Sequence, residues 1–241
     1  GQYKQLNSLE ELSSTKNNDF VAKASITNTF GISRRLGAMY QYGDNNWAIA
    51  GSMFTRELTE HPSPTPHGIG WGVRGYWAPI NTAGSIFHIG ASYNDYDTDS
   101  DTVQWRARPM ADLSNRIIDT GSLKNTDRVS TWGLESMWVH GPFKLQGEYM
   151  DSTTSRYNSA AGDFSGSAGY VSALWNITGE TWGYKGGTPT TPLPNEPASG
   201  MWQLGLRYDT IDLNDGTIVP GTTAPKVVGA PGGKMDSWTF G

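Results

Sequence analysis

Residues 131–139 and 143–150 alternate apolar and polar side chains, and only residues 140–142 separate them. In the first stretch one face is mostly apolar and carries Trp132, Leu134, Ser136 and Trp138. The opposite face carries Thr131, Gly133 and Glu135. Because side chains along a strand have a period of two, each stretch predicts a β-strand with one apolar and one polar face. The short link between them, which contains Gly141 and Pro142, predicts a tight turn.

Similar alternation recurs along the chain, and the links between the stretches are alternately short and long. The other stretches are 1–5, 36–42, 47–54, 70–77, 86–93, 168–177, 201–208 and 236–241. The long links are 6–35, 55–69, 94–130, 151–167 and 209–235. Tight turns at one end and long loops at the other are typical of an antiparallel up-and-down transmembrane β-barrel. One link, 178–200, is long although it falls on the side of the short turns.

The composition also favours a barrel over a soluble core. Only 36% of the residues are apolar, 30 are glycine, and the mean hydropathy is -0.50. A barrel with a water-filled lumen needs apolar residues on its outer face alone, whereas a soluble domain must fill a core. The chain has no cysteine, which excludes disulfides and thiolate metal sites. Its net charge of -5 argues against nucleic-acid binding.

The two faces of the predicted strands suggest a lipid side and a lumen side. Aromatic residues concentrate near strand ends, as in the girdles of membrane barrels. We expect the opposite, polar face to line the lumen with Gln41, Ser52, Arg74, His88, Glu135, Lys144, Gln146, Glu148, Ser172, Asn176, Gln203 and Arg207. A soluble sandwich of two sheets would place these residues in solvent. The small residues on the apolar face favour the barrel, because a sandwich core requires larger aliphatic side chains: Gly51, Gly75, Ala91, Gly147 and Ala173.

Basic residues concentrate in two of the long links and mark where an anion would be handled. Segment 1–35 holds Lys4, Lys16, Lys23, Arg34 and Arg35, and segment 94–130 holds Arg106, Arg108, Arg116, Lys124 and Arg128. Arg106 and Arg108 are two residues apart, so in an extended segment both project to one side. Guanidinium groups bind phosphate in bidentate fashion, and rows of them are a basis of anion selectivity. Four aspartates in 94–101 leave open whether these arginines are paired and neutralised.

No motif points to catalysis. The histidines do not show the spacing of metal ligands, and no nucleophile elbow or phosphate-binding glycine loop appears. We therefore expect no enzymatic activity, no metal and no cofactor.

Several segments resemble the phosphate- and polyphosphate-selective porin family of Gram-negative outer membranes. They are GQYKQLNSLEELSSTKN (1–17), SRRLGAMYQYGDNNWAIAGSMFTREL (33–58), VRGYWAP (73–79), WRARP (105–109), DTG (119–121), WGLESMWVHGPFKLQGEYM (132–150) and GYVSALWNITGE (169–180). The resemblance implies a 16-stranded barrel, usually trimeric, with a loop folded inward. It makes 6–35 the constriction loop and 94–130 the loop that carries an arginine ladder. It also implies an extended segment after TGE, which accounts for 178–200.

The resemblance assigns roles to individual basic residues. Lys16 falls where members place a constriction lysine, Arg106 and Arg108 fall on ladder positions, and Arg74 matches an arginine of the wall. Arg34, Arg35 and Arg116 are secondary candidates. Two departures weaken phosphate selectivity: Glu11 stands where some members have a basic residue, and Met110 where the ladder would continue.

The resemblance also implies that residues 1–241 form the middle of a single barrel domain of about nine or ten strands, lacking the first four and the final two or so. The implied function is passive, anion-selective diffusion of phosphate or polyphosphate across the outer membrane, with lipid around the barrel and a homotrimeric assembly. A general or sugar-selective porin and a soluble carbohydrate-binding β-sandwich are the alternatives.

Overall fold

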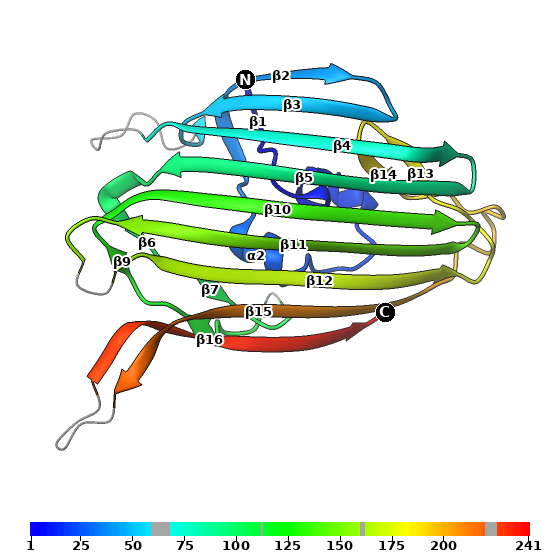
Figure 1. Cartoon of the computed structure of the whole chain (residues 1–241). Coiled ribbons are helices and arrows are strands. Elements are labelled where there is room, and N and C mark those ends of the chain that lie inside the picture. The colour runs from blue at the N-terminus through cyan, green and yellow to red at the C-terminus, as the bar shows by residue number, and fades with distance from the viewer. Residues whose placement is uncertain (59–67, 112, 160–161, 220–225) are drawn as a thin grey trace.

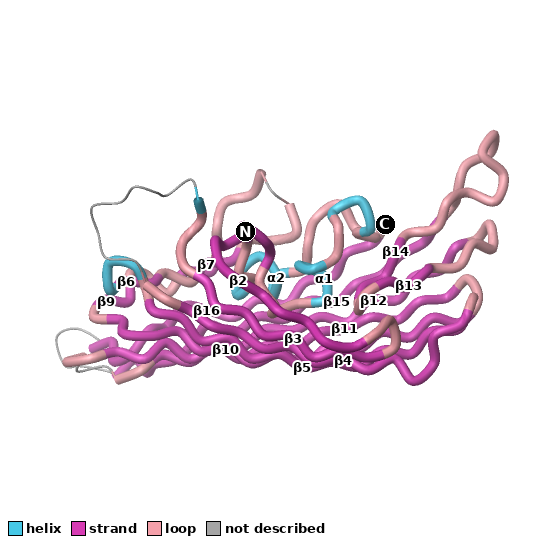
Figure 2. The backbone as a smooth tube through the Cα atoms, turned by 90° about the horizontal axis from the view of Figure 1, so that it is seen from above, coloured by secondary structure: helices cyan, strands magenta, loops and turns pink. Residues whose placement is uncertain are grey.

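The computed structural model describes residues 1–58, 68–111, 113–159, 162–219 and 226–241. Within these residues, ten strands form one antiparallel sheet in the order β1-β2-β3-β4-β5-β10-β11-β12-β15-β16. Each strand pairs with the next long strand along the chain (Figure 1). The sheet curves into a trough and does not close on itself (Figure 2). The predicted all-β, up-and-down partial barrel is therefore confirmed.

The strands of the sheet are β1 (Gln2–Lys4), β2 (Arg34–Gly43), β3 (Trp47–Phe54), β4 (Gly70–Thr82), β5 (Ser85–Asp97), β10 (Thr126–His140), β11 (Phe143–Arg156), β12 (Phe164–Asn176), β15 (Gln203–Val219) and β16 (Lys226–Phe240). Short strands pair in hairpins outside the sheet: β6 (Thr102–Val103), β7 (Arg106–Ala107), β8 (Ile118–Asp119), β9 (Leu123–Lys124), β13 (Gly183–Lys185) and β14 (Thr188–Thr190). The helices are α1 (Leu9–Leu12), η1 (Thr15–Asn17), α2 (Ser25–Phe30) and η3 (Asp99–Asp101).

The sheet exposes its apolar face and covers its polar face. On β10, Leu134 is 52% exposed and Trp138 is 41% exposed, whereas Glu135 is 6% exposed. A soluble sheet protein would show the reverse, so the apolar face is the one that meets lipid. This single layer also excludes the sandwich alternative. No helix in the described part of the chain is long and apolar enough to cross a membrane.

Aromatic side chains form two rows on the exposed face. Near the long loops, the rings of Trp71 and Tyr93 lie 5.3 Å apart and those of Trp132 and Tyr149 lie 5.4 Å apart. Near the short turns, the rings of Phe143 and Trp175 lie 6.0 Å apart, and Tyr42 lies against Trp47. The same strand, β10, contributes Trp132 to one row and Trp138 to the other, about 20 Å apart along its axis. The expected pair of girdles is present.

The strands continue further toward the long loops than the alternation predicts. Strand β11 ends at Arg156 and β12 begins at Phe164, so both extend into the predicted loop 151–167. Strands β15 and β16 occupy most of the predicted loop 209–235. The added part of β11, 151–156 (DSTTSR), is polar on both faces, although its ladder with β10 continues. The hydrogen-bonded ladder between the strands thus continues beyond the membrane. There a strand needs no apolar face, so the alternation by which it is recognised in the sequence is lost.

Two connecting segments lie on the concave side of the sheet (Figures 1 and 2). We call residues 5–33, between β1 and β2, the first inner segment, and the described residues of 98–125, between β5 and β10, the second inner segment. The hairpin β13–β14 belongs to the link between β12 and β15, on the side of the short turns (Figure 1). All three segments approach the polar face of the wall.

Candidate functional site: the concave face of the wall

A carboxylate of the wall holds the start of α1. Glu148 on β11 accepts hydrogen bonds from the backbone N–H groups of Leu9, at 2.8 Å, and Glu10, at 2.9 Å. The hydroxyl of Tyr170 on β12 donates to the same carboxylate at 2.8 Å. Helix α1 also begins with a side-chain cap, because Ser8 Oγ accepts from the N–H of Glu11. Wall and segment thus satisfy the free N–H groups of this turn together.

A second group of charges lies further along the wall. Arg207 on β15 donates from Nε to Asp209 at 2.8 Å, and its Nη1 lies 3.6 Å from Glu10. Asp209 in turn accepts from the backbone N–H of Ser25 at 2.9 Å. The side chains of Arg207 and Asp209 are 1% and 0% exposed, so these charges depend on each other. They fix the first inner segment at the start of α2.

Burial raises the pKa of Glu10, which lies in α1 outside the strands. The hydroxyl of Thr27, Arg207 and the N–H of Ala24 act in the opposite direction, because they stabilise the charged carboxylate. Burial is the largest of these effects.

Between these two groups, Asp19 joins three parts of the chain. It accepts a hydrogen bond from Lys144 Nζ on β11 at 2.6 Å and another from Trp182 Nε1 at 2.9 Å. The ammonium of Lys144 also lies 5.6 Å from the centroid of the Trp182 ring. Close by, Asn17 Oδ1 accepts from the backbone N–H of Thr191 at 3.2 Å. The first inner segment is therefore tied both to the wall and to the link that carries β13–β14.

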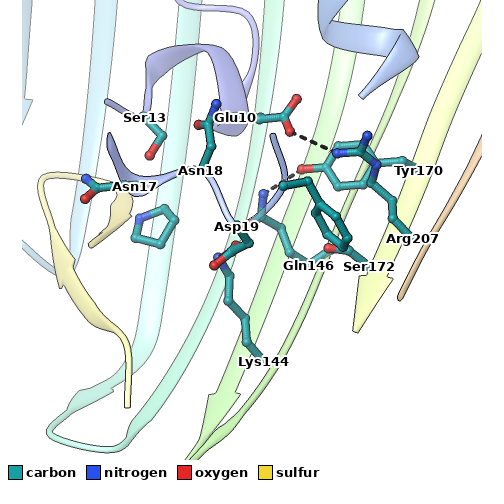
Figure 3. Close-up of a pocket in the computed structure, with 12 residues that line it drawn as sticks. Glu10, Ser13, Asn17, Asn18, Asp19, Lys144, Gln146, Tyr170, Ser172 and Arg207 are labelled. Atoms are coloured by element: carbon teal, nitrogen blue, oxygen red, sulfur yellow. Dashed lines mark hydrogen bonds and ion pairs between the residues drawn. The ribbon is translucent and has the colours of Figure 1, made fainter. Parts of the chain in front are cut away.

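A small cavity of about 20 Å³ lies among these groups, between the first inner segment and the wall. Figure 3 shows Lys144 extending from the wall toward Asp19, and Arg207 approaching Glu10. The volume suffices for a water molecule. Four buried polar atoms of the lining lack a hydrogen-bond partner among the described residues: Ser13 Oγ, Asn18 Oδ1, Gln146 Oε1 and Arg207 Nη2. The cavity is a polar contact zone rather than a passage.

The second inner segment packs by apolar contacts. Trp105 meets Phe30 of α2 edge to face, with ring centroids 5.2 Å apart, and its Nε1 donates to Thr154 of the wall at 3.0 Å. Ala107 and Ile118, one on each strand of the β7–β8 hairpin, belong to the same buried cluster. The two inner segments are therefore in contact with each other as well as with the sheet.

The structure places the predicted basic residues in three environments. Lys16 lies exposed in η1, and Arg106 and Arg116 lie exposed in the second inner segment, where Arg116 Nη1 donates to the Arg106 carbonyl at 3.2 Å. Arg108 is partly buried in the same segment. Arg34 is exposed and Arg35 partly buried on β2, opposite Lys4 and Tyr3 of β1. The structure brings Arg106 and Arg116 together, while Arg34, Arg35 and Arg74 lie elsewhere.

Arg74 is buried and paired. Its Nε lies 3.0 Å from Glu135 Oε1, and its Nη2 donates to the carbonyl of Gly187 at 2.9 Å. His88 bridges Glu135 and Tyr184, with its ring nitrogens 2.9 Å from the carboxylate and 2.6 Å from the hydroxyl. This cluster attaches the β13–β14 hairpin to the wall. An arginine with 5% exposure and a carboxylate partner differs in kind from the exposed arginines.

Acidic residues near the predicted site have partners of their own. Asp95 is bonded to Arg128 and Ser130, and Asp101 accepts from the hydroxyl of Tyr157 at 2.7 Å. Within the described residues these contacts engage two of the aspartates that precede the arginines. Glu11, the acidic departure in the first inner segment, pairs with both Lys4 and Lys23.

Sequence reasoning did not single out several residues of this face. Lys144, Glu148 and Arg207 were expected on the lumen face, but not as anchors of a segment. Asp19 and Trp182 were not singled out. The signal for Trp182 is its place as an isolated tryptophan in a stretch rich in glycine, threonine and proline, where a large ring requires a packing partner.

An antiparallel sheet with a lipid-facing apolar side, two aromatic rows and a charged concave side occupied by its own loops is the wall of a transmembrane β-barrel. The sequence matches the family described as "Phosphate-selective porin O and P" over residues 1–241. The chain belongs to this family, whose members lie in the outer membrane of Gram-negative bacteria.

Two relatives show the extent of the match. A protein of Caulobacter vibrioides described as uncharacterized is 30% identical over 255 residues, which cover 99% of this chain and 48% of that protein. Porin O of Pseudomonas aeruginosa is 29% identical over 174 residues, which cover 64% of this chain and 40% of that protein. The chain thus spans about half the length or less of these relatives.

Proposed function

We propose that the chain forms part of an outer-membrane porin that conducts anions by passive diffusion, with phosphate or polyphosphate as the solute. The observation that supports anion preference is the contrast between exposed and paired cations on the concave side. Lys16 and Arg106 are exposed, and no described acidic side chain forms an ion pair with either. Exposed cations replace part of an anion's hydration at weak successive sites, so that it binds and leaves.

Within the described residues, the carboxylates closest to Arg106 bond to other groups. Asp119 lies opposite Arg106 in the β7–β8 hairpin, but its carboxylate accepts from Gln104 and from the N–H of Gly121. Asp95 is occupied by Arg128. We infer that the second inner segment presents a ladder of arginines, with Arg106 and Arg108 as its main members and Arg116 beside them. Arg34 and Arg35 are secondary, and Arg74 acts as a structural cation of the wall.

The arrangement gives less support to a sugar-selective pore, which guides its solute along exposed aromatic rings. On the concave side, the aromatic residues Trp105, Tyr170 and Trp182 are buried. The exposed tryptophans of the sheet lie on the lipid side. A homotrimer within outer-membrane lipid remains part of the proposal, as does the role of 6–35 as the constriction loop. The proposal includes no enzymatic step.

The test is the double variant Arg106→Ala with Arg108→Ala in the full-length protein. Planar-bilayer recordings under a salt gradient should show a fall in anion-over-cation permeability, by about fivefold for each charge that acts on the ion at close range in water. Lys234→Ala serves as the control. Lys234 is exposed on the same face of β16 as Trp238, so this substitution removes a cation from the outside of the barrel. An unchanged reversal potential in the double variant would rule out the arginine ladder.

A further inference from the structure

The first inner segment and the link between β12 and β15 meet at one buried group, formed by Asp19, Lys144 and Trp182. Asp19 belongs to the first inner segment, Lys144 to the wall and Trp182 to the link. Both donors reach the same carboxylate, at 2.6 Å and 2.9 Å, and each uses a different oxygen. Trp182 is 1% exposed, and the side chain of Lys144 is also 1% exposed. The group is therefore built as a unit, shielded from solvent.

Lys16 sits just before this group in the chain. It occupies the middle of the single turn η1, and the residue that follows it, Asn17, accepts from the N–H of Thr191. Asp19 comes three residues after Lys16. The turn is therefore fixed at its C-terminal side by two contacts, both of which involve the link between β12 and β15. No contact to the wall fixes the Lys16 side chain itself within the described residues, so the backbone anchors set its position.

We propose that Asp19, Lys144 and Trp182 are positioning residues that hold Lys16 at its place in the conduction path. This inference rests on the proposed function, because it assigns Lys16 to anion selection. The link enters from the side of the short turns and the first inner segment connects strands at the side of the long loops. The group therefore lets a residue from one side of the membrane set the position of a cation supplied from the other.

The variant Trp182→Phe tests the inference with little disturbance. It removes one N–H donor and keeps an aromatic ring, and Asp19 retains Lys144 as its partner. Bilayer recordings of the full-length protein should show a fall in anion-over-cation permeability of at least half the fall caused by Lys16→Gln. In the Lys16→Gln background, Trp182→Phe should cause no further fall, because the cation to be positioned is gone.

Two further variants guard against a purely structural effect. Trp202→Phe makes the same chemical change at a tryptophan that is 67% exposed, and it should leave selectivity unchanged. The double variant Asp19→Asn with Lys144→Met removes both charges at once, so no buried charge loses its partner. It should reproduce the effect of Trp182→Phe. Where Lys16→Gln lowers selectivity, equal falls from Trp182→Phe with and without Lys16, or no fall from Trp182→Phe, would overturn the proposal.

A positional readout separates failure of this inference from failure of the proposed function. The chain contains no cysteine, so Lys16→Cys introduces a single thiol into it. The rate of its modification by a charged thiol reagent should change at least twofold when Trp182→Phe is added. If Lys16→Gln does not alter selectivity, the proposed role of Lys16 fails, and this rate alone decides whether the group positions residue 16. An unchanged rate would contradict the positioning role.

Discussion

Both inner segments bury apolar side chains, such as Ile26 and Ile118, but only the first adds several buried charged contacts to the wall within the described residues. The first inner segment is attached at buried charges: Glu148 holds α1, Lys144 holds Asp19, and Asp209 holds the start of α2. The second inner segment is attached mainly by apolar side chains, with Trp105 and Ile118 in a buried cluster. Charged contacts demand an accurate geometry, whereas apolar contacts depend on area and shape. The charged contacts therefore fix the position of the first inner segment, and the apolar contacts hold the second inner segment against the wall.

The largest expected effect comes from breaking a charged contact on one side only. Arg207→Met leaves Asp209 buried with no cation, so the free energy of unfolding should fall by about 3–5 kcal/mol. Denaturant unfolding of the full-length protein in lipid vesicles measures this fall. Adding Asp209→Asn should restore part of the stability, because the unpaired charge is then absent. A double variant as unstable as the single one would contradict the argument.

An apolar contact of the second inner segment should cost somewhat less. Ile118 is 3% exposed, so Ile118→Ala should lower the free energy of unfolding by about 3 kcal/mol through lost burial and the cavity left behind. The neighbouring Ile117 is 63% exposed, and Ile117→Ala should change stability little. The loss at position 118 should not depend on salt concentration. If high salt reduced it, the contrast between the two segments would be wrong.

A single hydrogen bond at the charged attachment should cost less again. The hydroxyl of Thr27 donates to Glu10 at 2.6 Å, and Thr27→Val removes this donor while it keeps the shape of the side chain. The expected loss is about 2 kcal/mol, because the acceptor is a buried carboxylate. Thr29→Val is the matched control, since Thr29 donates only to a backbone carbonyl at 3.5 Å. Equal losses at positions 27 and 29 would show that the carboxylate is not important.

The smallest effect is a dependence on pH that only the first attachment should show. Burial raises the pKa of Glu10 above its value in the unfolded chain, so the folded protein binds the proton more tightly. This contribution to stability is complete below the unfolded pKa, about 4.3, and is lost as pH rises through the raised folded value, with a slope of at most about 1.4 kcal/mol per pH unit. Glu10→Gln should reduce the change of the free energy of unfolding with pH in that range. Ile118→Ala should leave this pH dependence unchanged. Denaturant unfolding at a series of pH values measures both.

Sequence reasoning succeeded where neighbouring residues carry the information. The alternation around Trp132 and Glu135 defined both the strand and its two faces, because the period of two is a local property. It underestimated β11, whose outer part is polar on both faces, and β15, whose outer part buries Ile211 and Leu213 on the concave side instead of presenting apolar residues to lipid. The attachments of the inner segments could not be predicted in this way. Leu9 and Glu148 lie 139 positions apart, and nothing local tells which carboxylate of the wall meets which N–H group.

Arg74 illustrates the same limit. Its place on the lumen face followed from the strand pattern, and the resemblance suggested a wall arginine. Its pairing with Glu135, 61 positions away, depends on the register between β4, β5 and β10. A positive residue on the right face can therefore be a structural cation or a free one, and only the folded geometry distinguishes the two.

The length of the last hairpin has a consequence at the cell surface. A strand needs about 9–11 residues to cross a bilayer, and β15 and β16 contain 17 and 15. The excess lies toward the long loops, the side that faces the exterior in outer-membrane barrels, where the hairpin bends away from the rest of the sheet (Figure 1). We therefore expect this hairpin to stand above the lipid, within reach of an antibody or a phage that approaches the cell.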